Sequence, residues 1–138
     1  MVADFVLDAS VTAAWCFGDE ATQASRALHE SLGSRRAVVP TLWHAENANL
    51  LLVAERRNRI TPERCTELLE LIGILPVETI DESDRIRGPI LRLARTHRLT
   101  VYDAIYLDLA IQRGLALATR DQDLRRAADA AGVKVIET

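Results

Sequence analysis

The sequence predicts an α/β fold in which helices cover both faces of a parallel β-sheet. Short apolar runs of strand length alternate with longer segments in which apolar residues recur every three or four positions. Strands and helices that alternate in this way are typical of a parallel sheet that is buried on both faces. The chain of 138 residues is about the length of one domain with one core. We therefore expect a single three-layer α/β/α domain over residues 1–138.

The first half of the chain contains two expected strands and three expected helices. A strand is predicted at residues 4–8, where the apolar run FVL stands between two aspartates. Helices are predicted at residues 11–17 and 21–32, because their apolar residues recur with helical spacing. A short apolar strand at residues 37–40 then leads into a long helix at residues 41–57.

The next helix has clear signals at both ends. Thr61 is a favoured N-cap residue, Pro62 suits the first helical position, and Gly73 is a typical helix end. We therefore predict a helix at residues 61–73, followed by a third strand at residues 75–80.

The last part of the chain continues the alternation. Helices are predicted at residues 84–98 and 99–110, and Pro89 either begins the first of them or kinks it. The remaining expected elements are a strand at 115–119, a helix at 123–132 and a fifth strand at 133–137.

Composition and charge narrow the classes of function. The net charge of −3 argues against a generally basic nucleic-acid binder. Lys134 is the only lysine, however, so almost all of the positive charge comes from arginine. Because arginine pairs with phosphate through two hydrogen bonds, the composition is compatible with a local phosphate-binding patch. Cys16 and Cys65 lack the spacing of a CxxC motif, so we expect reduced thiols in a cytoplasmic protein. Asp4 and Asp8 stand where a signal peptide would be apolar, and no apolar run approaches the ~20 residues of a membrane span.

Four acidic residues occupy positions that could bring them together. Asp8 and Asp121 follow the first and fourth expected strands, Glu46 lies early on an apolar helix face, and Asp103 lies in the first turn of its helix. If the strand order is 3-2-1-4-5, the crevice beyond the carboxyl ends of strands one and four would collect all four carboxylates. Such carboxylates repel each other unless some are protonated or a cation neutralises them. Oxygen ligands without histidine or cysteine favour Mg²⁺ or Mn²⁺.

The helix LTVYDAIYLDLA contains two aspartates with different expected surroundings. Asp103 shares a helical face with Tyr106, Leu107 and Ala110, where an unpaired charge would be costly. A cation beside Asp103 would explain this position. Asp108 lies more than a third of a turn away, so we expect it to face water.

The aspartates also have purely structural interpretations. Thr100 to Asp103 resembles a capping box, and Asp121 would be favoured at a helix start by the helix dipole. Asp8 would then be a strand terminator. Glu46 lies past the first turn of its helix, so capping does not explain it.

Four segments of the chain, FVLDASV, AEN, LTVYDAIYLDLA and LATRDQDL, resemble the signatures of PIN-domain ribonucleases, above all the toxins of VapBC-type toxin–antitoxin pairs. The resemblance implies a five-stranded parallel sheet in the order 3-2-1-4-5, a carboxylate pocket for Mg²⁺ or Mn²⁺, and cleavage of single-stranded RNA. By position, the catalytic and metal-binding residues would be Asp8, Glu46, Asp103 and Asp121. Ser10 and Thr119 match small hydroxyl residues that support the pocket.

Asp123 is a second acid beside the fourth site residue. Residues two apart on a helix diverge by ~200°, so Asp121 and Asp123 cannot both face one ion. If Thr119 caps the helix, Asp121 faces the pocket and Asp123 pairs with Arg126 or lies in water. If Asp121 is the cap, its side chain turns to the backbone amides and Asp123 moves nearer the pocket. We favour Asp121 as the ligand.

The resemblance also implies partners. These are the RNA substrate, a small antitoxin protein whose carboxyl-terminal segment lies along a groove, and a second copy of the chain in a homodimer. The segments at residues 48–57 and 65–75 hold more leucine than one core needs, although core packing is the alternative explanation. A non-catalytic PIN-like module that binds metal or RNA is the alternative function. Candidate contacts to the RNA backbone, or solvated helix faces, are Arg35, Arg36, Arg56, Arg57, Arg59, Arg85, Arg87, Arg92 and Arg95.

Overall fold

The computed structural model describes residues 4–138, so residues 1–3 of the predicted domain lie outside the described chain. The strands are β1 (Phe5–Leu7), β2 (Ala37–Pro40), β3 (Val77–Ile80) and β4 (Ala116–Ala118). The α-helices are α1 (Ala9–Cys16), α2 (Gln23–Glu30), α3 (Leu42–Arg56), α4 (Pro62–Gly73), α5 (Leu91–His97), α6 (Val101–Arg113) and α7 (Gln122–Ala130). Strands and helices alternate as predicted.

The strands form one parallel sheet in the order β3-β2-β1-β4. Phe5 of β1 pairs with Ala37 of β2 on one side and with Ala116 of β4 on the other. This order agrees with the predicted one for strands one to four. The carboxyl ends of β1 and β4 are therefore neighbours, as the convergence of the acidic residues requires.

The fifth expected strand, at residues 133–137, does not form. In its place a single parallel bridge joins Leu117 and Val135. Leu117 donates its N–H to the carbonyl of Lys134 and accepts one from Ile136, each at 2.9 Å. Successive residues of a strand turn their hydrogen-bonding groups to opposite neighbours. β4 has only three residues, and the backbone hydrogen-bonding groups of its first and last residues face β1. Leu117 is therefore the one residue of β4 whose N–H and carbonyl can pair with a fifth strand.

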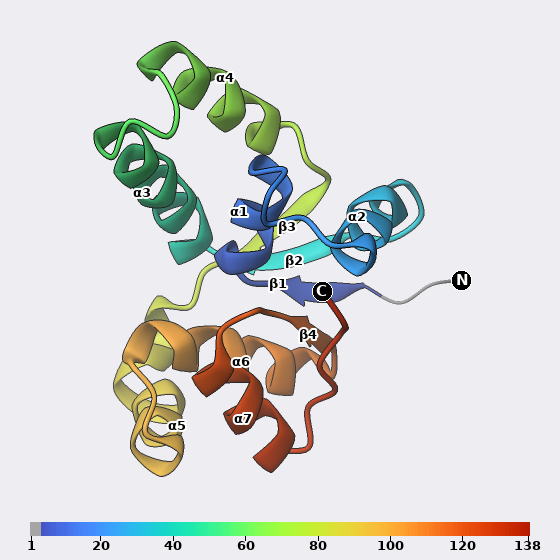
Figure 1. Ribbon diagram of the computed structural model, residues 1–138. Coiled ribbons are helices and arrows are strands. Elements are labelled where there is room, and N and C mark those ends of the chain that lie inside the picture. Colours follow the sequence, from blue (N-terminus) through green and yellow to red (C-terminus); the bar gives the residue numbers. More distant parts are fainter. Residues whose placement is uncertain (1–3) are drawn as a thin grey trace.

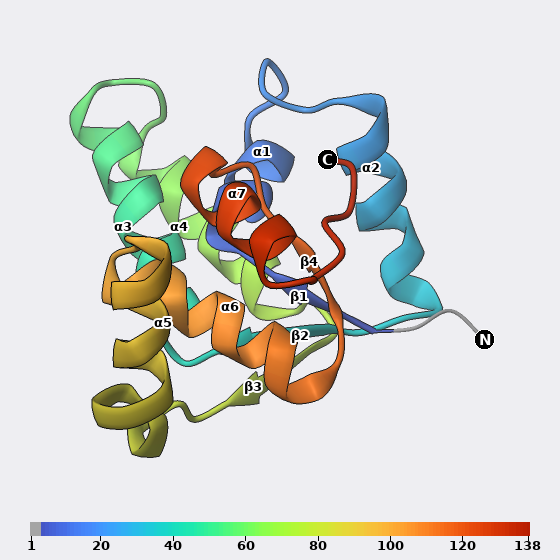
Figure 2. The same cartoon turned by 90° about the horizontal axis from the view of Figure 1, so that it is seen from below.

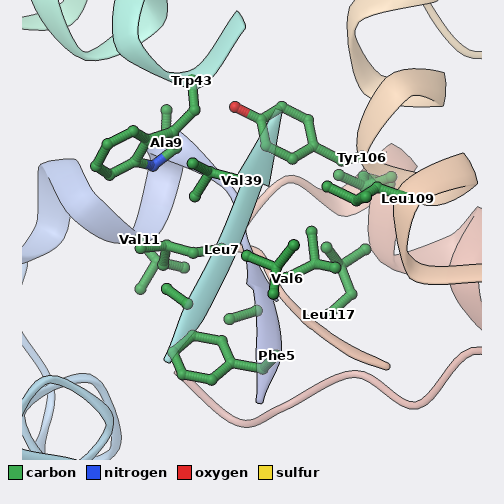
Figure 3. Packing of buried hydrophobic residues seen from close by; sticks show 14 of the residues in the cluster. Phe5, Val6, Leu7, Ala9, Val11, Val39, Trp43, Tyr106, Leu109 and Leu117 are labelled. Atoms are coloured by element: carbon green, nitrogen blue, oxygen red, sulfur yellow. The ribbon is translucent and has the colours of Figure 1, made fainter. Parts of the chain in front are cut away.

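The helices lie in two layers on either side of the sheet. Helices α1 to α4 lie on one side and α5 to α7 on the other (Figure 1). The view from below shows α6 crossing the sheet between α5 and α7 (Figure 2). The main core lies around β1, where Phe5 and Leu7 are buried with Trp43 of α3 and Tyr106 of α6 (Figure 3). These layers confirm the predicted α/β/α arrangement.

Helix α4 begins and ends where its capping signals predict. The Thr61 hydroxyl accepts the N–H of Arg64 at 3.1 Å, and Pro62 is the first residue of α4. Pro89 lies inside a π-helical turn, Ile86–Ile90, that leads directly into α5. A proline removes one N–H donor and clashes with the carbonyl four residues earlier, and the wider turn is a way to accommodate it.

Asp108 corrects the expectation that it faces water. Its residue is only 4% exposed, and both carboxylate oxygens accept hydrogen bonds from Arg85. Arg85 Nε lies 2.7 Å from Oδ2, and Nη2 lies 3.0 Å from Oδ1. The sheet and the segment that carries Arg85 cover most of the circumference of α6. The spacing of apolar residues along α6 therefore does not show which of its residues face water.

The cysteines agree with the predicted reduced state, because Cys16 and Cys65 both carry free thiols. Across residues 4–138, no helix combines the length and the apolar character needed to cross a membrane.

Candidate active site

The four predicted acidic residues meet at the carboxyl ends of β1 and β4. They line a pocket of about 230 Å³ together with four further residues of α1 and α3. The pocket lining comprises Asp8, Ala9, Ser10, Glu46, Asn49, Leu50, Asp103 and Asp121. No histidine or cysteine is among them, so the candidate ligands are oxygen atoms.

Asp8 is held in place by two hydroxyl groups. Ser10 Oγ donates to Asp8 Oδ2 at 2.6 Å, and Thr119 Oγ1 donates to the same oxygen at 2.7 Å. Burial raises the pKa of Asp8 above its ordinary value, and the two hydrogen bonds oppose part of that rise. Because both of these bonds end on Oδ2, Oδ1 is the oxygen without a hydroxyl partner and is the better candidate to bind a cation.

The same hydroxyls join the ends of the two strands. Ser10 Oγ accepts the N–H of Arg120 at 2.9 Å, and Thr119 Oγ1 accepts the N–H of Asp121 at 3.1 Å. Each hydroxyl therefore connects the carboxylate that follows β1 to the backbone that follows β4. The supporting role of Ser10 and Thr119 in catalysis stays a prediction.

Asp121 combines two roles that we treated as alternatives. It is the N-cap of α7, where its Oδ1 accepts the N–H of Leu124 at 2.9 Å, so the helix begins as in the second of the two alternatives. Capping does not remove Asp121 from the pocket, because a carboxylate has two oxygens and only one of them caps. Asp123 does not line the pocket; its side chain is 74% exposed and lies 3.6 Å from Arg126.

Glu46 and Asp103 face the pocket from two different helices. The hydroxyl of Tyr106, one turn along α6 from Asp103, donates to Glu46 Oε1 and so joins α6 to α3. Burial and the neighbouring carboxylates Asp8 and Asp103 raise the pKa of Glu46 to about 6. Burial, Asp121 and Asp8 likewise raise the pKa of Asp103 to about 6. The pocket therefore holds more negative charge than it can easily carry at neutral pH.

These pKa values predict how stability depends on pH. The folded-state pKa values of Glu46 and Asp103 lie above the ordinary 4.5 and 3.8. Their contribution to stability is complete below the ordinary values and is lost as pH rises through about 6. In EDTA, the melting temperature should therefore fall more steeply between pH 5 and pH 7 than in a Glu46→Gln/Asp103→Asn double variant. Identical pH profiles of the two proteins would contradict the assignment of the raised pKa values.

The donor set fits a hard divalent cation with open coordination positions. Carboxylate oxygens are the ligands that Mg²⁺ and Mn²⁺ prefer. Within residues 4–138, no group of three or more acidic, histidine or cysteine side chains is arranged so that it could hold a metal ion by itself. Mg²⁺ usually keeps several waters and takes one or two carboxylates rather than a cage made only of protein groups. A pocket in which carboxylates line an open space is consistent with that mode of binding.

The chain matches one known family of protein domains. A family model described as the PIN domain matches residues 5–130. The chain belongs to the PIN domain family. A comparison with curated protein sequences gives no match.

Solved structures share the fold of this PIN domain at low sequence identity. The structure of PAE2754 from Pyrobaculum aerophilum is 21% identical with a TM-score of 0.72, over 96% of this chain and 83% of that one. VapBC2 from Rickettsia felis, bound to a DNA fragment from its promoter, is 14% identical with a TM-score of 0.66, over 96% of both chains. A toxin–antitoxin complex from Klebsiella pneumoniae is 18% identical with a TM-score of 0.61, over 96% of both chains.

The structure adds residues that the sequence analysis did not assign to the site. Asn49 and Leu50 line the pocket one turn after Glu46. Residues three and four positions after Glu46 share its helical face, so this spacing could have predicted their place in the pocket. Tyr106 was counted only as an apolar residue, although its position three residues after Asp103 puts its hydroxyl near the acids.

Some of the arginines proposed for the RNA backbone are already paired. Arg36 lies 3.8 Å from Asp4 and from Glu78, Arg59 pairs with Asp19 and Glu20, and Arg85 pairs with Asp108. Arg35 lies over the Phe5 ring. The candidates that are exposed on helices or at their ends are Arg56, Arg57, Arg87, Arg92 and Arg95.

Proposed function

We propose that this PIN domain is a Mg²⁺- or Mn²⁺-dependent endoribonuclease that cleaves single-stranded RNA and acts as the toxin of a type II toxin–antitoxin pair. The observation that carries the proposal is the pocket in which Asp8, Glu46, Asp103 and Asp121 converge without histidine or cysteine. Such a site suits a hard cation and a phosphate rather than acyl transfer or thiol chemistry. Membership of the PIN domain family supports the same activity.

The side chains have distinct roles in the proposed reaction. A divalent ion in the pocket would supply an activated water and positive charge beside the phosphate that is cleaved. Asp8 would offer Oδ1 to the ion, because its other oxygen is held by Ser10 and Thr119. Tyr106 fixes the orientation of Glu46 across the pocket. Attack by water leaves a 5′-phosphate and a 3′-hydroxyl, so the RNA 2′-hydroxyl is not the nucleophile.

We further propose that a protein antitoxin binds this chain. The Rickettsia felis and Klebsiella pneumoniae structures support this partner, because the first is a VapBC2 assembly and the second a toxin–antitoxin complex. The chain has an apolar groove of about 290 Å³ between α1, α2 and α4, where Leu71 and Ile74 remain exposed. The leucine-rich segment at residues 65–75 lines this groove, and an antitoxin segment would cover it. The homodimer stays a prediction.

The function is tested by incubating the purified chain with an end-labelled single-stranded RNA in Mg²⁺, Mn²⁺ or EDTA. We expect cleavage in either metal, intact RNA in EDTA, and products with a 5′-phosphate and a 3′-hydroxyl. A double-stranded RNA of the same sequence is the matched control and should be cleaved more slowly. A non-catalytic module would bind the RNA and leave it intact in every buffer. That result, with RNAs of varied sequence, would overturn the proposal.

A further inference from the structure

Two exposed apolar side chains lie near the acidic pocket and have no part in its metal chemistry. Tyr102, at the start of α6, is 61% exposed and directly precedes Asp103. Leu50 of α3 is 40% exposed and lines the pocket itself. The two side chains belong to different elements of the site, since α6 carries Asp103 and α3 carries Glu46.

The position of Tyr102 follows from the geometry of its helix. Residues four apart on a helix share a face, so Tyr102 lies one turn before Tyr106 on the face that meets Glu46. Tyr102 is therefore at the end of α6 that carries Asp103, one turn before the hydrogen bond that joins α6 to α3. Among residues 4–138, no side chain makes a hydrogen bond or ring contact with Tyr102. The exposed part of its ring is available to a ligand.

The acidic pocket creates a binding problem that an exposed ring can solve. Four carboxylates and an RNA backbone are both negative, and the whole chain carries a net charge of −3. The carboxylates therefore repel those parts of the RNA backbone that contact neither the bound ion nor an arginine. Bases of a single strand are unpaired and have free faces, and stacking on an aromatic side chain stabilises them without any requirement for charge.

We propose that Tyr102 is a stacking surface for the base of a nucleotide next to the cleaved phosphate, with Leu50 contacting the same strand from α3. Tyr102 is thus a substrate-positioning residue, and its role rests on the proposed RNA cleavage. Because every base has a face that can stack, Tyr102 contributes affinity with little sequence preference. A duplex offers no free base faces along its length, so Tyr102 favours single-stranded RNA over double-stranded RNA.

The kinetic test compares three variants that should all remain folded. Tyr102→Ala removes the ring, Tyr102→Phe keeps it, and Ile111→Ala changes a similarly exposed apolar residue at the other end of α6. Loss of one base-stacking contact should raise KM for a short RNA roughly tenfold and leave kcat nearly unchanged. Tyr102→Phe and Ile111→Ala should behave like the wild type, and equal melting temperatures would show that all of the proteins are folded.

A second measurement identifies the base that stacks. A set of RNA oligonucleotides, each lacking one base near the cleaved bond, is given to the wild type and to Tyr102→Ala. The wild type should lose affinity at one abasic position, and Tyr102→Ala should be insensitive to that position. Equal KM values and the same abasic profile for the two proteins would overturn the inference.

Two other outcomes are distinguishable from these. If Tyr102→Ala changes the oligomeric state by light scattering and leaves KM unchanged, Tyr102 contacts a protein and the inference is wrong. If the wild type cleaves no RNA, the proposed function fails instead. Fluorescence anisotropy with a labelled RNA, with Ca²⁺ in place of Mg²⁺, would then still compare the affinities of wild type and Tyr102→Ala. Equal affinities there would overturn the stacking role.

Discussion

Asp8→Asn is expected to lower metal-dependent RNA cleavage by about a hundredfold or more. Asparagine keeps the shape of the side chain but removes the charge that Oδ1 would offer to the ion. The loss of one preorganised electrostatic group at a reacting centre typically costs two to three orders of magnitude. The measurement is single-turnover cleavage of a labelled RNA at matched Mg²⁺, with Asp129→Asn, an exposed acid on α7, as the control.

The same substitution should change stability in a way that a simple loss of structure would not. Asp8 is buried and its pKa is raised, so Asp8→Asn removes a destabilising charge and should raise the melting temperature in EDTA. Millimolar Mg²⁺ stabilises the wild type by binding the folded state, and this response should disappear in the variant. In cells, Asp8→Ala should relieve growth inhibition without loss of soluble protein. An unchanged response to Mg²⁺ would show that Asp8 does not bind the ion.

Asp121→Asn is expected to lower cleavage by about tenfold or more, whereas Asp123→Asn should change it by less than about tenfold. Asp121 lines the pocket, and one of its oxygens is free of the capping bond to Leu124. Asp123 does not line the pocket, and its exposed side chain pairs with Arg126, so water and Arg126 screen most of its charge.

The pair of variants is a matched comparison because both substitutions remove one negative charge from the start of α7. Asparagine is itself a good N-cap residue, so Asp121→Asn should keep the helix intact and its melting temperature in Mg²⁺ should report the loss of the ion. The opposite ranking of the two variants, measured on folded proteins, would mean that Asp123 is the fourth ligand.

The sequence alone determined the class of the fold and the place of the candidate site. Periodicity is a local property of the chain, so the alternation of strands and helices could be predicted from nearest neighbours in sequence. Asp8 and Asp121 follow apolar runs, and parallel strands bring their carboxyl ends to one edge. The cap signals of Thr61 and Pro62 were also local and were confirmed.

Only the tertiary structure decided which polar groups are paired and which are free. Asp108 is buried because α6 is covered by the sheet and by the segment that carries Arg85, which no pattern within α6 reveals. The fifth strand does not form because β4 is short and pairs with β1 through most of its residues, which leaves a single bridge to Val135. Asp121 both caps α7 and lines the pocket, because the pairing of β1 with β4 brings the start of α7 to the same pocket as Asp8. Partners that come from distant parts of the chain leave no periodic trace in the sequence, so burial and pairing become known only when the elements pack.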